Sequence, residues 1–314
     1  MIIILKGQNI NQTFFTFGNF RINKRNNESF PTNNTNSMEQ EKNYRYVPKE
    51  KHNPIVKNKL PNVKNMFMVA SGKGGVGKST VAAGLALSLA LEGYSVGLMD
   101  ADIYGPSIPT LFDLENCDRP EIIEQNGRNM IEPYNRFGIK IMSIGFFFDS
   151  HQAVIWRGPM LSNGLKQMIN DTNWGKLDYL IIDTPPGTGD VHITLLQDFE
   201  ISGAIVVTTP QHVALSDVQK VIKMFGDKQI GIPVLGIVEN MSWFIPSPHP
   251  EEKYYLFGKG GGDLLAKTFN IPLLAQIPIN EKICTACDEG KLNEIMKDEA
   301  VRLAFQSIFL QVTL

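Results

Sequence analysis

The chain has 314 residues, of which 43% are hydrophobic and 20% charged, and its formal net charge is −2. This composition excludes collagen-like, coiled-coil and wholly disordered proteins. No apolar run approaches the roughly 18 residues that a membrane-spanning helix needs, so we expect no membrane insertion, and the near-neutral charge gives no indication of nucleic-acid binding. Three cysteines are too few for a disulfide framework, which favours a cytoplasmic, reducing compartment.

The charge is distributed unevenly along the chain. Residues 1–65 contain 11 Lys and Arg against 4 Asp and Glu, a net charge of +7, which leaves residues 66–314 with −9. Because this first part is rich in Asn, Lys and Pro and shows no sustained period of 2 or 3.6, we predict a largely disordered basic leader. Three interpretations stay open: a targeting segment over residues 1–37 that leads to an organelle matrix, translation from upstream of a functional start at Met38, or the remnant of an N-terminal domain.

From Met66 onward, short apolar runs alternate with longer helical stretches, which is the pattern of βαβ units. The apolar runs predict strands at 66–70, 95–99, 140–144, 179–182, 204–208 and 234–238. The stretches between them predict helices at 78–91, 159–170, 191–198, 216–225 and 262–269. Several of the strands are continuous runs of Val, Ile and Leu, as in a parallel sheet covered on both faces. We expect one α/β domain over residues 66–314, with ligands at the carboxyl ends of its strands.

A glycine-rich segment follows the first predicted strand directly and precedes a helix. It matches G-x-x-x-x-G-K-[ST] and predicts a P-loop, in which backbone N–H groups and the helix N-terminus bind a polyphosphate. Lys78 is expected to reach the β- and γ-phosphates, the Ser79 hydroxyl to bind Mg²⁺, and Thr80 to lie near the α-phosphate. The ATP-binding residues are therefore Gly72, Lys73, Gly74, Gly75, Val76, Gly77, Lys78, Ser79 and Thr80.

Lys73 is a second lysine, early in this loop. It cannot easily fold back onto phosphates bound by its own loop, which suggests that it serves a facing subunit. The loop resembles the deviant Walker A loop of the MinD/ParA/nitrogenase-iron-protein class, and this resemblance implies that Lys73 reaches across a nucleotide-sandwich dimer. A lysine opposite a γ-phosphate would offset charge that develops during phosphoryl transfer.

Two more motifs end predicted strands. Asp100 and Asp102 follow the strand at 95–99, and we expect Asp102 to position the attacking water and Asp100 to be structural. Asp183 follows the strand at 179–182 and is expected to bind Mg²⁺ directly or through water, like the Asp of a Walker B motif. The sequence thus predicts an ATPase, which converts ATP and water to ADP and phosphate. Its candidate catalytic residues are Lys73, Lys78 and Asp102, and its candidate magnesium ligands are Ser79 and Asp183.

Seven motifs together resemble the Mrp/ApbC group of ATPases. They are S-G-K-G-G-V-G-K-S-T (71–80), D-A-D-I-Y-G-P-S-I-P (100–109), W-R-G-P-M (156–160), D-T-P-P-G-T-G-D (183–190), T-P-Q-H-V-A-L-S-D (209–217), G-I-V-E-N-M-S (236–242) and F-G-K-G-G-G (257–262). The resemblance covers nearly all of residues 60–290. It implies a P-loop NTPase fold, with a mostly parallel sheet and helices on both faces.

The same resemblance implies a function. Members of the group are regarded as iron–sulfur cluster carriers that work as homodimers. The chain is accordingly expected to be an ATP-hydrolysing carrier or assembly factor that delivers clusters to apoprotein clients as a nucleotide-gated homodimer. The resemblance also implies that Asn240 contacts the adenine base and that the backbone near Pro278 closes the base pocket.

The chain departs from the family's pattern at the usual cluster site. The family usually carries C-x-x-C shortly after E-N-M-S, whereas residues 243–255 contain no Cys, and His249 there is expected to be a surface-loop residue. The chain is therefore similar to a branch that lacks this pair. Another C-x-x-C, Cys284 and Cys287, could supply four thiolates from two subunits to an iron–sulfur cluster, or could pack on a helix as two small buried hydrophobes.

Two other functional classes stay open. A positioning ATPase similar to MinD and ParA, without cluster cargo, would favour a basic amphipathic helix for the membrane surface at the C-terminus. Residues 299–314 contain Arg302 as their only cation, so we expect a helix packed on the domain instead. Electron transfer through a bridging cluster needs cysteines beside the loops that contact phosphate, and only Cys117 lies nearby.

Overall fold

The structure is a computed structural model that describes residues 57–314 except 126, 148–157, 229–230, 247–248, 250–251 and 314. Residues 1–56 of the predicted leader lie outside the described residues, so the three interpretations of the leader stay predictions. Trp156 and Arg157 of the W-R-G-P-M motif also lie outside them. Among the helices that are described, none is long and apolar enough to cross a membrane.

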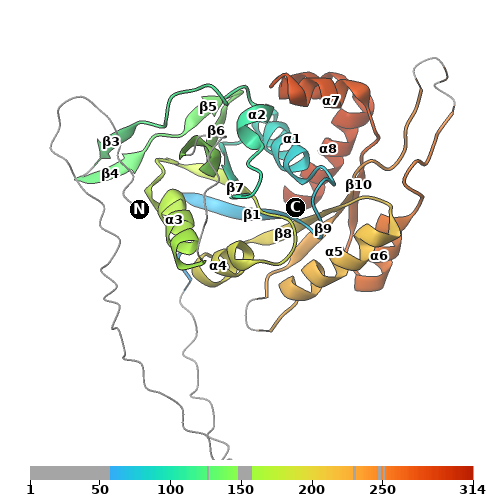
Figure 1. Cartoon of the computed structure of the whole chain (residues 1–314), viewed down its shortest axis with the longest axis horizontal. Coiled ribbons are helices and arrows are strands. Elements are labelled where there is room, and N and C mark those ends of the chain that lie inside the picture. Colours follow the sequence, from blue (N-terminus) through green and yellow to red (C-terminus); the bar gives the residue numbers. More distant parts are fainter. Residues whose placement is uncertain are drawn as a thin grey trace, which may run out of the picture. The chain divides into compact units, whose positions relative to one another are not determined.

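An eight-stranded sheet forms the centre of the described domain, in the order β10-β9-β8-β1-β7-β2-β6-β5 (Figure 1). All neighbours in this sheet pair in parallel except the edge pair β5–β6, which is antiparallel. The strands are β1 (Val63–Ser71), β2 (Val96–Asp100), β5 (Tyr134–Arg136), β6 (Ile139–Ser143), β7 (Leu177–Asp183), β8 (Gly203–Thr208), β9 (Val234–Glu239) and β10 (Leu273–Gln276). A separate antiparallel pair contains β3 (Ile122–Gln125) and β4 (Arg128–Ile131).

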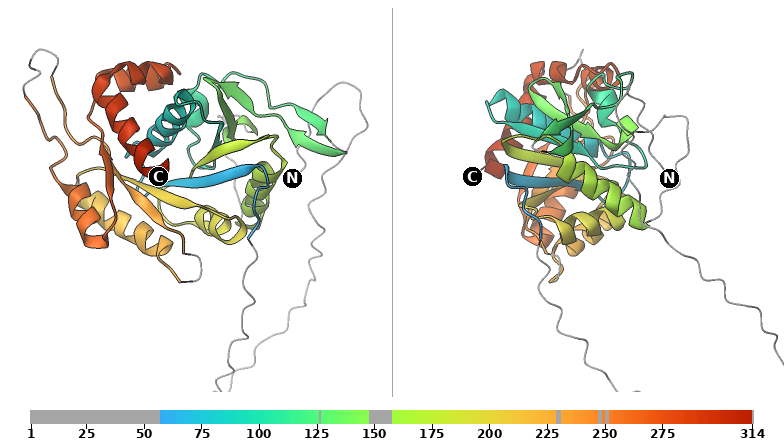
Figure 2. Two further views of the ribbon diagram at one scale, coloured as in Figure 1. Left: turned by 180° about the vertical axis from the view of Figure 1, so that it is seen from behind. Right: turned by 90° about the vertical axis from the view of Figure 1, so that its left-hand side faces the viewer.

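Helices cover both faces of this sheet (Figures 1 and 2). One face carries α1 (Lys78–Leu91), α2 (Ile108–Leu111), α7 (Glu281–Asp288) and α8 (Glu299–Thr313). The other face carries α3 (Gly158–Asp171), α4 (Asp190–Asp198), α5 (His212–Phe225) and α6 (Gly261–Phe269). Two short 3₁₀ helices, η1 (Ile144–Phe147) and η2 (Leu292–Lys297), complete the described elements. Every residue of β2 and β8 is buried, as expected of central strands between two helical layers.

The six strands and five helices predicted from the sequence are all present, with ends that differ by at most four residues. The first strand begins at Val63, three residues before its predicted start and inside the predicted leader. The predicted C-terminal helix is also present as α8, whose buried side chains include Val301, Phe305 and Ile308. The strands β3, β4, β5 and β10 and the helices α2 and α7 were not predicted.

The packing of α1 shows why its sequence is apolar on all sides. The helix lies between the sheet and α8, and ten of its residues are buried. Gly84 faces the ring of Phe305 so closely that a Cβ there would lie 2.2 Å from the ring carbon Cζ. The absence of a side chain at Gly84 therefore sets how closely α1 and α8 approach.

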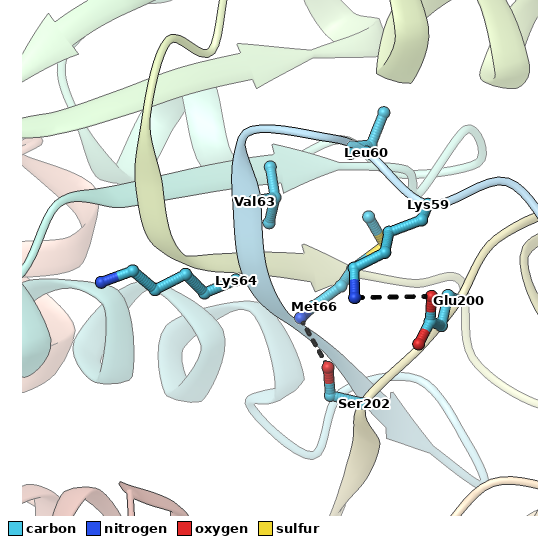
Figure 3. Close-up of a pocket in the computed structure, with 7 residues that line it drawn as sticks. All are labelled: Lys59, Leu60, Val63, Lys64, Met66, Glu200 and Ser202. Carbon is cyan, nitrogen blue, oxygen red and sulfur yellow. Dashed lines mark hydrogen bonds and ion pairs between the residues drawn. The ribbon is translucent and has the colours of Figure 1, made fainter.

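A small pocket lies at the amino end of β1 (Figure 3). Its volume is about 30 Å³, enough for one water molecule. The Met66 N–H donates to the Ser202 hydroxyl at 3.0 Å, and Lys59 lies 3.9 Å from Glu200. The residues that line it are Lys59, Leu60, Val63, Lys64, Met66, Glu200 and Ser202. Because the sequence motifs lie at the carboxyl ends of the strands, this pocket is at the opposite edge of the sheet.

Candidate nucleotide-binding site

The sheet order brings the predicted phosphate-site residues together. β1, which leads into the glycine-rich loop, lies next to β7, and β7 lies next to β2. In the register of these strands Asp183 pairs with Asp100 on one side and with Val69 on the other. Three motifs therefore meet at one edge of the sheet, where Lys78 contacts Asp183, 105 residues further along the chain.

The glycine-rich loop has the backbone geometry of an anion site. Gly75 and Gly77 have φ angles of 77° and 82°, in the left-handed region that favours glycine. Gly77 directly precedes α1 and has no side chain to cap it, so the first N–H groups of the helix are available to a phosphate. A Cβ at Gly77 would lie 2.2 Å from Asn240 Nδ2, so the position also lacks room for a side chain.

Lys78 lies in a buried cluster with two carboxylates. Its side-chain nitrogen lies 2.6 Å from Asp183 Oδ1 and 3.4 Å from Asp102 Oδ2, and it donates to the Ser79 hydroxyl at 3.2 Å. Lys78 and Asp102 are each 6% exposed and Asp183 is fully buried. A buried ammonium needs such partners, because its charge is otherwise costly to desolvate. Phosphate oxygens that enter the loop would compete with these carboxylates for Lys78.

The carboxylates outnumber the lysine that neutralises them. Burial raises the pKa of Asp183, while the Lys78 charge opposes the shift. Burial, reinforced by the Asp183 charge, raises the pKa of Asp100 to about 8. Among the described residues, Asp183 Oδ2 is a buried oxygen without a hydrogen-bond partner. An orphaned carboxylate oxygen beside the Ser79 hydroxyl fits the preference of Mg²⁺ for hard oxygen ligands, so Ser79 and Asp183 are the residues that could hold this ion.

Asp100 holds the backbone of the loop that follows it. Its side chain accepts hydrogen bonds from the N–H groups of Asp102 and Ile108, at 3.0 and 3.2 Å, and from the Ser143 hydroxyl at 3.0 Å. This is the arrangement of a structural carboxylate. Asp102, in contrast, faces Lys78 and accepts from the Tyr104 N–H at 3.3 Å.

Lys73 has a different partner. The structure groups Lys78 with Asp102 and Asp183, whereas the Lys73 ammonium donates to Gln211 Oε1 at 3.0 Å. Gln211 lies between β8 and α5, and β8 is the other neighbour of β1 in the sheet. The sequence motif T-P-Q-H contained Gln211, but no pattern within the sequence indicated that it contacts Lys73.

The two residues predicted to bind the base lie on adjacent segments. Asn240 follows β9 and Pro278 follows β10, and the segments are joined by hydrogen bonds from Ile277 N to Glu239 O (2.9 Å) and from Ser242 N to Ile277 O (2.9 Å). Asn240 Nδ2 donates to Val76 O at 2.9 Å, so its amide is bound to the phosphate loop. The contact of either residue with adenine stays a prediction.

Glu239 and His192 are buried polar residues that the sequence interpretation missed. Glu239 is 1% exposed and accepts from Ser242 Oγ (2.9 Å), Gly262 N (2.5 Å) and Gln276 Nε2 (2.7 Å). His192 Nε2 lies 3.0 Å from Thr184 Oγ1, and burial together with the Lys78 charge lowers the pKa of His192 to about 4. Glu239 lies within the motif G-I-V-E-N-M-S and His192 lies two residues after D-T-P-P-G-T-G-D, but the burial and the partners of these side chains could not be read from the motifs.

The cysteine pair lies on α7. Cys284 is exposed and its thiol lies 3.7 Å from Asp288 Oδ2, so the interpretation of the pair as two buried hydrophobes is wrong for this residue. Cys287 is half-buried, and burial raises the pKa of its thiol to about 11. A hydrogen bond with Thr80 of the phosphate loop opposes this shift. The described part of the chain contains no group of three or more His, Cys, Asp or Glu suited to a metal ion. His249 is exposed, as predicted.

Residues 62–313 match the protein-family model described as "ParA: NUBPL iron-transfer P-loop NTPase". The chain belongs to this family. Its relatives include the iron–sulfur cluster carrier protein of Aquifex aeolicus, 48% identical over 256 residues, which are 81% of this chain and 68% of the relative. They also include the iron–sulfur cluster transfer protein NUBPL of Dictyostelium discoideum, 44% identical over 237 residues, which are 76% and 72% of the two chains.

Solved structures give the same classification of the fold. A nucleotide-binding protein of Archaeoglobus fulgidus in complex with ADP is 38% identical, with a TM-score of 0.66 over 78% of this chain and 93% of that one. The cell division ATPase MinD of Pyrococcus furiosus has a TM-score of 0.55 at 20% identity, over 80% and 98% of the two chains. The α/β P-loop NTPase fold predicted from the sequence is thereby confirmed.

Proposed function

We propose that this P-loop NTPase binds and hydrolyses ATP and delivers iron–sulfur clusters to apoproteins, as a nucleotide-gated homodimer. The observation that carries the enzymatic part is the buried contact of Lys78 with Asp102 and Asp183 beside an uncapped helix N-terminus. The cargo is proposed from the names of relatives that are 44% to 48% identical.

In the proposed binding step, Lys78 exchanges its carboxylate partner for phosphate oxygens. Backbone N–H groups of residues 74–79 and the N-terminus of α1 receive the phosphates, and Lys78 turns from Asp183 to the β- and γ-phosphate oxygens. This releases the Asp183 carboxylate, which together with the Ser79 hydroxyl would hold Mg²⁺. When bound, Mg²⁺ neutralises phosphate charge.

In the proposed hydrolysis, water attacks the γ-phosphorus while the bond from that phosphorus to the β–γ bridging oxygen breaks, yielding ADP and phosphate. Asp102 lies within reach of Lys78 and is proposed to orient the water. Lys73 of a facing subunit is proposed to offset the negative charge that develops on the γ-phosphoryl oxygens. Each subunit of the dimer then completes the site of the other.

Nucleotide state is proposed to control the cargo through the loops after Asp102 and Asp183. Both loops begin at carboxylates that contact Lys78, so a phosphate that draws Lys78 away changes the contacts of both. A change at these loops would alter the arrangement of the two subunits, and with it the affinity for cluster or client.

For the cluster itself we propose Cys284 and Cys287 as candidate ligands, with two thiolates from each subunit. Residues 243–255 contain no cysteine, which supports assignment to the branch of the family without the usual pair. Cluster binding at Cys287 requires that iron displace the thiol proton, because burial favours the protonated form.

The experiment that tests this function compares the wild type with Lys78→Ala. We expect the variant to lose binding of a fluorescent ATP analogue and release of phosphate, while Lys220→Ala, which removes an exposed lysine of α5, leaves both unchanged. In a second arm, protein loaded anaerobically with iron and sulfide is mixed with an apo-ferredoxin, and cluster transfer is followed by circular dichroism. Unaltered hydrolysis in Lys78→Ala would refute the enzymatic part, and absence of transfer by the wild type would refute the carrier part.

A further inference from the structure

Among the sequence motifs that have no part in the function proposed above, two pack against each other. They are T-P-Q-H at 209–212, after β8, and F-G-K-G-G-G at 257–262, before α6. The structure packs the second motif on the first: a Cβ at Gly261 would lie 2.6 Å from the carbonyl oxygen of Pro210. The glycines thus allow the two backbones to touch.

The glycine motif is itself held from the other side. The buried carboxylate of Glu239, at the end of β9, accepts the Gly262 N–H at 2.5 Å. A Cβ at Gly262 would lie 3.0 Å from the same carboxylate. Pro210 therefore rests on a backbone that is fixed to the sheet.

The next residue, Gln211, has a fixed backbone, and its side chain accepts a hydrogen bond from Lys73. Its carbonyl oxygen accepts from Ala214 N (2.9 Å) and Leu215 N (3.2 Å), which fixes its backbone at the start of α5. Its amide oxygen accepts the Lys73 ammonium at 3.0 Å.

The backbone beside Lys73 is fixed to the same helix. Gly72 packs against α5, where a Cβ would lie 2.4 Å from Val218 N and 2.5 Å from the carbonyl carbon of Asp217. Lys73 and Gln211 are thus brought together by two packed backbones, and the contact does not depend on two freely rotating side chains alone.

We propose that Gln211 is the positioning residue for Lys73, which it holds through a neutral hydrogen bond until a phosphate of the facing subunit takes the ammonium over. A neutral amide orients the lysine without neutralising it, so the charge stays available for phosphate. A carboxylate at the same place would form an ion pair and would compete with phosphate oxygens for the lysine. This inference rests on the proposed function, because it assigns Lys73 a phosphate in a facing subunit.

The test uses Gln211→Glu, which keeps the size of the side chain and adds the competing charge. We expect the hydrolysis rate to fall by about tenfold, because charge-assisted pairs are markedly stronger than bonds to a neutral acceptor. The affinity for ATP should stay within about twofold of the wild type, because the phosphate loop and Lys78 are unchanged. Gln211→Ala removes the contact without adding charge and should lower the rate less than Gln211→Glu does. Gln125→Glu, at an exposed glutamine of β3, is the control for the charge itself.

A second measurement does not depend on hydrolysis. The ε-amine of Lys73 is acetylated with acetic anhydride in the nucleotide-free protein, and its modification is measured by mass spectrometry against that of Lys220. We expect slower acetylation of Lys73 in Gln211→Glu and faster acetylation in Gln211→Ala, because the first change strengthens its partner and the second removes it. Equal acetylation in the three proteins would overturn the proposed contact.

The two readouts separate the inference from the proposed function. If the wild type does not hydrolyse ATP while acetylation follows the expected order, the ATPase proposal fails and the contact stands. If hydrolysis depends on Lys78 while Gln211→Glu retains the wild-type rate, the ATPase proposal stands and the positioning role of Gln211 is refuted. We expect Gln211→Glu to have the melting temperature of the wild type, which shows that its lower hydrolysis rate does not result from unfolding.

Discussion

The ammonium of Lys78 and the carboxylate of Asp183 lie 2.6 Å apart in the protein interior, although 105 residues separate them in the chain. This pair joins the helix after β1 to the end of β7. It places the positive charge that phosphates require next to Asp183 Oδ1, while the second oxygen of the same carboxylate, Oδ2, has no hydrogen-bond partner in the described part of the chain.

Removal of Lys78 should destabilise the nucleotide-free protein, because Asp183 is then buried without its counter-charge. We expect Lys78→Ala to lower the free energy of unfolding by about 3 kcal/mol, a typical cost of breaking a buried ion pair. Lys78→Ala combined with Asp183→Asn should be more stable than Lys78→Ala alone, since no unpaired charge remains at residue 183. Urea denaturation of the wild type and the two variants measures this, and a double variant no more stable than Lys78→Ala contradicts the expectation.

Asp183→Asn should separate magnesium binding from nucleotide binding. The amide keeps the shape of the side chain but loses the charge that holds a divalent cation. We expect ATP affinity in EDTA to be at least that of the wild type, because Lys78 is freed from its partner, and the increase in affinity on adding Mg²⁺ to be lost. Titration with a fluorescent ATP analogue, with and without Mg²⁺, measures both effects. Asp178→Asn, at the amino end of β7, serves as the control, and its response to Mg²⁺ should match the wild type.

Sequence patterns predicted those parts of the fold and of the site that depend on residues close together in the sequence. The runs of Val, Ile and Leu in β7 and β8 predicted buried strands, and the residues from Gly72 to Thr80 predicted the phosphate loop. The edge strand β5, Tyr134–Arg136, is short and polar, and its position depends on pairing with β6. Likewise, the contact of Lys73 with Gln211 depends on β8 lying next to β1, and no local pattern contains that adjacency.

Stability should decrease as the pH falls from about 6.5 to 4, because of His192. Burial lowers the pKa of this side chain to about 4 in the folded protein, whereas the unfolded chain has an ordinary value near 6.5. In this window the unfolded state binds the extra proton, so the free energy of unfolding falls with decreasing pH, by up to about 1.4 kcal/mol per pH unit for one proton. We expect His192→Gln to remove this contribution. Urea denaturation at pH 7.5, 6 and 5 checks it, and equal pH slopes for variant and wild type would rule out the assignment.

The cysteines of α7 should differ in chemistry. Cys284 is exposed, whereas burial raises the pKa of Cys287 to about 11, so iodoacetamide at pH 7.5 should alkylate Cys284 first. If the pair binds an iron–sulfur cluster, anaerobic reconstitution with iron and sulfide should produce absorbance near 400 nm and protect both thiols. Cys284→Ser with Cys287→Ser should abolish that absorbance, and Cys117→Ser should leave it. Equal absorbance in the double variant would exclude these two residues as ligands.

Gly77→Ala should abolish ATP binding through the geometry of the phosphate loop. Gly77 has a φ of 82°, which is strained for alanine, and the added Cβ would lie 2.2 Å from the Asn240 amide nitrogen. The same nitrogen donates the hydrogen bond to Val76 O that joins the loop to the end of β9, so the added Cβ disturbs this bond. Gly93→Ala, at a similar φ of 87° with open space around it, carries the same backbone strain without the clash. We expect calorimetric titration to show ATP binding by Gly93→Ala and none by Gly77→Ala, and retained binding by Gly77→Ala would mean that this hydrogen bond is not needed to shape the loop.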